Sequence, residues 1–296
     1  MEHARRASSI GATTAVVVTI VACVSIAKAN DTYVGGLQWP FLSDMGRDPP
    51  AYYVFVVGLC STAICLLLVW HANTSLFNYQ YQAGVAVTGK CGRIFVAACG
   101  MASAVALPIL SICDTARFPD AHNYSAYAFF VLEAFAVLVN TGITYRIYTQ
   151  DDNDTRFTMD GLDRKVIRRV RRQAWLAQII VATLFLASFI IYIPVGLAVS
   201  CAFEHLSTTS CLQLNLGVDY CTKTMNLNAT YTKLWNYSEP GCHSVHQMRA
   251  GAQLACILTL VGYSLTFLFN YQDMKKYVEH DRSAYAVPPD CISRET

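Results

Sequence analysis

Six long apolar segments, separated by more polar stretches, recur along the chain. Each contains at least 18 residues, the length that a helix needs to cross a hydrocarbon core about 30 Å thick. Backbone groups in lipid must satisfy one another, so each segment is predicted to be a transmembrane helix. The segments cover residues 10–27, 51–70, 94–112, 124–145, 174–203 and 250–269.

This pattern predicts an all-α polytopic membrane protein, with a six-transmembrane-helix bundle in a domain at 1–277 and a tail at 278–296. Pro108 and Pro194 lie inside the third and fifth segments, where each removes an amide donor and is expected to kink its helix. The first segment also resembles a cleaved signal peptide, because it follows two arginines and ends in Ala-Lys-Ala. Its apolar run exceeds the usual signal-peptide core of roughly 7–15 residues, so we expect a retained helix.

The composition agrees with a membrane protein. Hydrophobic residues make up 54% of the chain and charged residues 14%, and the mean hydropathy is +0.34. A soluble chain of this size would have roughly a quarter of its residues charged. A soluble enzyme, a disordered protein and a nucleic-acid-binding module are therefore excluded, and no nucleic-acid partner is expected.

The distribution of basic residues predicts the orientation. Sixteen of the 22 Lys and Arg residues fall in the N-terminal segment, the second and fourth loops and the C-terminal tail, and six fall in the other loops. Lys and Arg are retained preferentially on the cytosolic side of a membrane. Both the N- and C-termini are therefore predicted to be cytosolic.

The longest loop on the opposite side, 204–249, combines cysteines with N-glycosylation sequons, two features of an oxidising lumen. Four cysteines permit three disulfide pairings, which the sequence does not distinguish. A zinc site is the alternative, but no C-x-x-C pair is present, so we expect a disulfide-containing lumenal loop and no metal. Cys211, Cys221 and Cys242 lie in the loop and Cys201 lies at its membrane edge, and the sequons begin at Asn228 and Asn236.

Common enzyme and cofactor motifs are missing from the sequence, so no catalytic residue or cofactor is assigned. Glu133 is the one clear carboxylate inside a span, where a charge costs at least about 2.5 kcal/mol. It either contacts a ligand, proton or lipid headgroup, or fixes helix packing, and packing is the simpler interpretation. His122, at the lumenal mouth of the same span, is either a pH-sensitive or basic group or a histidine that bonds the loop backbone.

A run of six basic residues in nine positions precedes the fifth span on the cytosolic side. Apolar residues alternate with them at helical spacing, so one face could lie on the bilayer while the other meets anionic headgroups. Membrane lipids, including anionic phosphoinositides, are therefore expected partners, although the run could serve only as a topology anchor. The basic residues are Arg164, Lys165, Arg168, Arg169, Arg171 and Arg172.

The loop before the second span carries the most specific motif. It reads W-P-F-L-S-D-M-G-R-D-P-P, and its distinctive members are Pro40, Ser43, Asp44, Gly46, Pro49 and Pro50. This motif resembles the DRAM/Frag family of six-span membrane proteins, the damage-regulated autophagy modulators and their CWH-type relatives. Weaker similarity continues in Phe118, His122 and Ala126, and in Gly262, Leu265, Thr266, Tyr271 and Gln272. Ala51 and Gln253 stand where the family often has Glu.

The resemblance implies a retained first helix and a non-channel protein that acts in membrane traffic or lipid handling. The leading hypothesis is a non-enzymatic regulator of autophagy or membrane lipid homeostasis. We expect it in endolysosomal or plasma membrane rather than in Golgi or ER. Some branches of the family imply membrane-protein partners as well. The alternative is a GPI-anchor remodelling factor or lipid-binding transferase of the secretory pathway. A small-solute transporter is third, because transport normally needs a relay of ionisable groups.

Overall fold

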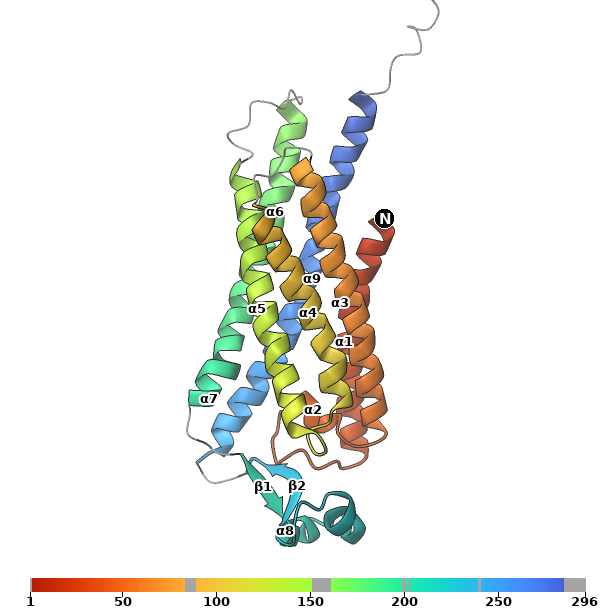
Figure 1. The fold of residues 1–296 in the computed structure, drawn as a ribbon, viewed down its shortest axis with the longest axis vertical. Coiled ribbons are helices and arrows are strands. Elements are labelled where there is room, and N and C mark those ends of the chain that lie inside the picture. The colour runs from red at the N-terminus through yellow and green to blue at the C-terminus, as the bar shows by residue number, and fades with distance from the viewer. Residues whose placement is uncertain are drawn as a thin grey trace, which may run out of the picture.

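The computed structural model describes residues 2–82, 89–150, 161–198, 201, 203–238 and 241–284. Within these ranges each membrane helix packs on the next one in sequence, and the last packs on the first, so the helices form a closed ring (Figure 1). The ring helices are α1 (Glu2–Ala29), α3 (Ala51–Gln82), α4 (Lys90–Ile112), α5 (Pro119–Gln150), α6 (Gly161–Ile190) and α9 (His243–Ala284).

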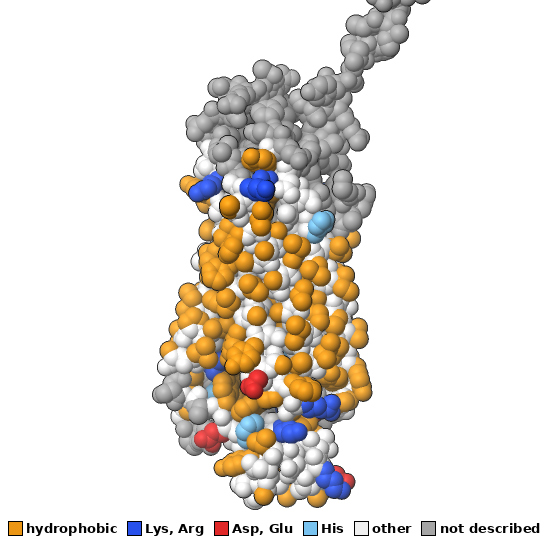
Figure 2. Space-filling view, viewed as in Figure 1, with side chains coloured by type: hydrophobic (Ala, Val, Ile, Leu, Met, Phe, Trp, Pro, Cys, Tyr) orange, Lys and Arg blue, Asp and Glu red, His pale blue; other side chains and the backbone are white. Residues whose placement is uncertain are grey.

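Six of the described helices are long and apolar enough to span a membrane. Apolar side chains cover the middle of the face shown in Figure 2, and charged side chains gather toward its two ends. The predicted six-helix architecture is confirmed, and the described residues form an all-α polytopic bundle with one small two-stranded sheet. The spans cover Arg6–Ala29, Ala51–Asn78, Lys90–Ile112, Pro119–Thr149, Arg168–Ala198 and His243–Phe269.

The two ends of the bundle differ. The N-terminus and the last turns of α9 lie at one end, here called the terminal end, and a small disulfide-bonded subdomain lies at the other, here called the disulfide end (Figure 1). The subdomain contains an antiparallel strand pair and two short helical segments, and the loop before α3 adds a one-turn helix beside it. These elements are β1 (Glu204–Ser207), β2 (Tyr231–Asn236), α8 (Thr208–Gln213), the π-helix η2 (Tyr220–Thr224) and α2 (Leu42–Met45).

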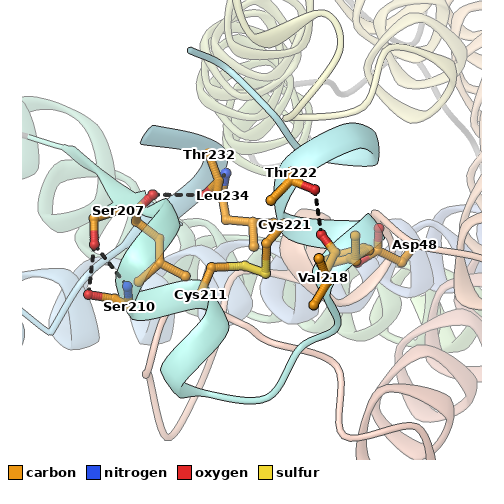
Figure 3. Close-up of a disulfide and its surroundings, with 11 residues drawn as sticks. Asp48, Ser207, Ser210, Cys211, Val218, Cys221, Thr222, Thr232 and Leu234 are labelled. Carbon is orange, nitrogen blue, oxygen red and sulfur yellow. Dashed lines mark hydrogen bonds between the residues drawn. A yellow bond between two sulfur atoms is a disulfide. The ribbon is translucent and has the colours of Figure 1, made fainter. Parts of the chain in front are cut away.

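All four cysteines predicted to be oxidised are in disulfides, and the structure supplies the pairing. Cys211 of α8 bonds Cys221 of η2, and Leu234 of β2 packs against this bridge in the subdomain's own apolar cluster (Figure 3). Cys201 bonds Cys242, which joins the end of the fifth span to the start of α9. One disulfide therefore closes the subdomain internally, and the other holds its two ends together at the bundle.

The two prolines in the spans are accommodated differently. α4 continues through Pro108 without interruption. Around Pro194 the fifth span changes into a π-helix, η1 (Ile191–Val195), followed by the short α7 (Gly196–Ala198). A π-helical turn shifts the hydrogen-bond register where a backbone amide is missing, and such turns are frequent at functional sites.

Candidate functional site

An apolar cavity lies inside the ring of helices. It has a volume of about 80 Å³, and side chains from five ring helices and α2 line it. Most of them are aliphatic or aromatic, as in Leu59, Leu107 and Phe129. Polar side chains enter the lining at few places, among them Ser43, His122, Glu133 and Gln253. The cavity therefore suits an apolar group with a few polar contacts.

Glu133 is anchored at the cavity wall by two donors from neighbouring helices. The Trp70 indole Nε1 and the Ser103 hydroxyl both donate to its Oε1, at 3.1 and 2.5 Å. Gly100 makes this possible, because a Cβ at that position would overlap the Trp70 ring. The packing role predicted for Glu133 thus has a physical basis, and the carboxyl also borders the cavity.

A second polar cluster joins α3, α5 and α9, one turn beyond Trp70 on α3 and two turns beyond Glu133 on α5. Asn73 donates to Asn140 at 2.7 Å, and Asn140 in turn donates to the Tyr263 hydroxyl at 2.8 Å. Thr141 shares that hydroxyl at 2.9 Å. Buried side-chain hydrogen bonds of this type fix helix register in a membrane. Asn73 is completely buried.

His122 bonds the backbone, as the simpler of its two predicted roles requires. Its Nδ1 lies 2.7 Å from the carbonyl oxygen of Leu110 and 2.8 Å from that of Cys113. Both partners are acceptors, so Nδ1 carries the proton and the ring ties the end of α4 to the start of α5. The same side chain lines the cavity.

The family loop motif forms the polar centre of the disulfide end. Asp44 is 1% exposed and accepts from the hydroxyls of Tyr237 at 3.0 Å and Thr115 at 3.4 Å. Arg47, which is 5% exposed, lies 3.9 Å from Asp44 and 3.0 Å from Asp48. Burial raises the pKa of the Asp44 carboxyl, and the nearby guanidinium opposes that rise.

The same network reaches into the disulfide-bonded subdomain. Asp48 accepts from the hydroxyl of Tyr220 in η2 at 2.8 Å, and Arg47 donates to the backbone oxygen of Tyr33 at 2.8 Å. Burial raises the pKa of Tyr237, so this phenol remains a donor to Asp44. The motif therefore joins the first loop, the subdomain and the α4–α5 connection.

The other motif residues shape this arrangement. Ser43 lines the central cavity, and Pro40 lines a groove outside it. Gly46 lies so close to Phe55 that a Cβ there would overlap the ring. Pro49 and Pro50 stand immediately before α3 and are joined by a cis peptide bond.

A groove of about 800 Å³ opens at the disulfide end between α1, the first loop, the subdomain and α9. It shares Leu42 and Gln253 with the central cavity, so these two residues form the partition between the spaces. Gln253 accepts from the Leu42 amide at 3.3 Å and donates to the Tyr192 hydroxyl of η1 at 3.0 Å. The residue that replaces a family Glu thus occupies the junction of groove, cavity and π-helix.

The basic run lies at the opposite end, in the first turns of α6, which continue directly into the fifth span. The contact of this run with anionic headgroups stays a prediction. Arg168, Arg169 and Arg172 are exposed, and Arg171 is buried with an interaction of its own. Of Arg164 and Lys165, only the helical backbone lies within the described structure.

Comparison with known proteins identifies the family. The Frag1/DRAM/Sfk1/Cwh43P N-terminal domain matches residues 7–276. The chain belongs to this family. No curated protein and no solved structure matches it. As a Frag1/DRAM family member with six apolar spans, it is an integral membrane protein in contact with lipids.

The structure brings together parts of this family member that are far apart in sequence. Ser43, His122, Glu133 and Gln253 border one cavity, whereas the basic run does not contribute to it. The sequence analysis missed Trp70 and Ser103, whose residue types are unremarkable in an apolar helix. It also noted Gln253 only as a replacement for Glu. The available signal was that several apolar spans each contain a polar residue.

Proposed function

We propose that this protein is a non-enzymatic membrane regulator of lipid homeostasis that binds an acyl chain of a membrane lipid in its central cavity. The observation that carries the proposal is the apolar cavity, separated from the groove at the disulfide end by Leu42 and Gln253. Ligand sites are typically apolar hollows with a few placed polar groups. A lipid fits this description because its chain is apolar and its headgroup is polar.

The sizes of the two spaces decide how such a lipid would lie. One water molecule occupies about 10–15 Å³ of such a cavity, and a methylene group is similar in size to a water. The volume of 80 Å³ therefore admits a run of roughly five to eight methylene groups. The headgroup and the rest of the lipid must remain in the groove, which has ten times that volume. The lipid would enter from the leaflet at the disulfide end.

A pair of alanines on α5 provides a test. Ala126 lines the cavity and Ala128 is exposed on the same helix. Ala126→Phe should fill the cavity and reduce co-purified lipid, measured by native mass spectrometry, by at least about tenfold, because each displaced methylene loses about 0.8 kcal/mol and two of them already exceed a factor of ten. Ala128→Phe should leave the bound lipid unchanged. Equal lipid content in both variants and the wild type would contradict the proposal.

In cells, we propose that the protein acts on autophagy from endolysosomal or plasma membrane, as membership of a family that includes the DRAM proteins suggests. Deletion should change autophagic flux, and an endogenous tag should mark those membranes. Ala126→Phe should reproduce the deletion, whereas Ala128→Phe should restore flux. Unchanged flux together with residence confined to the Golgi would contradict this cellular role.

We also propose that the disulfide end faces the lumen or cell exterior and that both termini are cytosolic. Oxidised cysteines at that end and the 16-to-6 basic asymmetry support this orientation. Asn228 is exposed at a turn of the subdomain, and Asn236 lies at the end of β2. A glycosidase-sensitive mobility shift should appear and be abolished by Asn228→Gln combined with Asn236→Gln. A glycan found on Asn153 in this double variant would show that the protein has the opposite orientation.

A second candidate is a factor for GPI-anchor lipid remodelling, in which Glu133 and His122 contact the lipid. The observation that favours it is that both side chains line the same cavity. Glu133→Gln and His122→Ala should then reduce the retention of GPI-anchored proteins at the cell surface, measured by flow cytometry. Ala128→Ser is a matched control on the exposed face of α5. Wild-type retention in both cavity variants would remove this candidate.

A further inference from the structure

A second hollow lies at the terminal end, on the outside of the ring between α3 and α4. It has a volume of about 560 Å³ and is separate in its lining from both the central cavity and the groove. Its polar residues stand close to the helix ends, and its apolar residues extend along α4 toward the middle of the span. The lining consists of Thr74, Asn78, Tyr81, Lys90, Arg93, Ile94, Ala97, Ala98 and Met101.

Arg93 is the unusual member of this lining. It is 6% exposed, and its guanidinium donates to the Asn78 side-chain oxygen at 2.9 Å and stacks over the Tyr81 ring at 4.1 Å. Its Nε is buried without a hydrogen-bond partner. Among the residues that the structure describes, no carboxylate forms an ion pair with this arginine. A cation that is desolvated beside a neutral amide and a ring is short of compensating negative charge.

Lys90 adds a second cation one turn earlier on α4. It is exposed at the rim of the hollow, at the first residue of the helix, where backbone amides also favour an anion. Below Arg93, the exposed side chains of Ile94, Ala98 and Met101 continue the hollow as an apolar strip. Positive charge above an apolar strip matches the chemistry of an anionic phospholipid.

We infer that the hollow between α3 and α4 is a binding site for an anionic phospholipid, with its phosphate at Arg93 and Lys90 and an acyl chain along Ile94, Ala98 and Met101. The site is distinct from the basic run of α6, whose residues do not line it. It also does not depend on the lipid proposed for the central cavity. Basic pockets between membrane helices are suited to phosphate-bearing headgroups.

The test uses the full-length protein in neutral detergent, with Arg168, Arg169 and Arg172 replaced by Gln so that α6 does not compete. Three probes separate the sources of binding: dioctanoyl phosphatidic acid, dioctanoylglycerol without the phosphate, and inorganic phosphate without the chains. Native mass spectrometry should show at least about tenfold tighter binding of the phosphatidic acid than of either other probe. Equal binding of the two lipids, or full occupancy by inorganic phosphate, would overturn the inference.

Variants at the site complete the test. Lys90→Gln should weaken phosphatidic acid binding about fivefold, the effect of one basic residue near a phosphate. Arg93→Gln should weaken it further, and Ala98→Phe should block the apolar strip, whereas Ala128→Phe should bind normally. Lys90 and Ala98 are exposed, so these variants remain informative if Arg93→Gln does not fold. Unchanged affinity in Lys90→Gln and Ala98→Phe would overturn the site.

Discussion

Replacing Arg47 with methionine should destabilise the protein by about 3–5 kcal/mol, the cost of removing one partner from a buried charge network. Methionine retains much of the side-chain length but leaves Asp44 buried without its cation and removes the bond to the Tyr33 carbonyl. For a chain of this size the loss corresponds to roughly 6–20 °C in Tm. Thermal unfolding in detergent, followed by tryptophan fluorescence and size-exclusion chromatography, measures it.

A matched control lies in the same end of the molecule. Lys223 pairs with Asp219 at 2.9 Å, but both side chains are largely exposed. Lys223→Met should therefore cost at most about 1 kcal/mol. Arg47→Lys should fall between the two, because it keeps the charge but not the planar fork that reaches several acceptors. If Arg47→Met unfolds at the same temperature as Lys223→Met, the motif is not the structural centre of this end.

The network around Arg47 explains why the first-loop motif could be found from sequence while its role could not. Pro40, Gly46 and the Pro49–Pro50 pair indicate a constrained loop from their residue types alone. The partners of Asp44 and Asp48, Tyr237 and Tyr220, lie about 190 and 170 residues further along the chain. Nothing in the local sequence connects a loop before the second span with the disulfide-bonded subdomain.

The six-helix architecture, in contrast, could be predicted from the sequence because it depends on local features. A transmembrane span depends on length and hydropathy within one segment, so six helices follow from local composition. Their neighbours in the ring, and hence the cavity, depend on how residues pack between segments. Glu133 illustrates the difference: its position inside a span was evident, whereas its anchoring by Trp70 and Ser103 required the fold.

The motif and the cavity are parts of one arrangement. Leu42 and Ser43 belong to the motif loop and line the cavity, while Asp44 is held by the subdomain and the α4–α5 connection. Gln253 then ties the Leu42 amide to the π-helix of the fifth span through Tyr192. A movement of the subdomain would therefore be transmitted through the loop to the partition between groove and cavity.

Replacing Gly100 with leucine should have the second large effect, because it forces two helices apart at the cavity wall. The first atom of the new side chain would already overlap the Trp70 ring, which is 2% exposed and packs against Phe267. Overpacking of this kind costs about 1–3 kcal/mol, and a ring that must leave its Glu133 bond adds to it. We expect a total of about 3 kcal/mol or more, with a loss of cavity-bound lipid.

Gly142 supplies the matched control, because it lies in α5 with nothing within 4 Å of an added Cβ. Gly142→Leu should be neutral or slightly stabilising, since leucine favours a helix over glycine by about 0.8 kcal/mol. Trp70→Phe then separates the two contributions at Gly100: it keeps an aromatic ring but removes the N–H donor to Glu133. If packing against Trp70 dominates, Gly100→Leu will be far more damaging than Trp70→Phe. Equal unfolding midpoints for the two glycine variants would mean that α3 and α4 do not approach each other closely at Gly100.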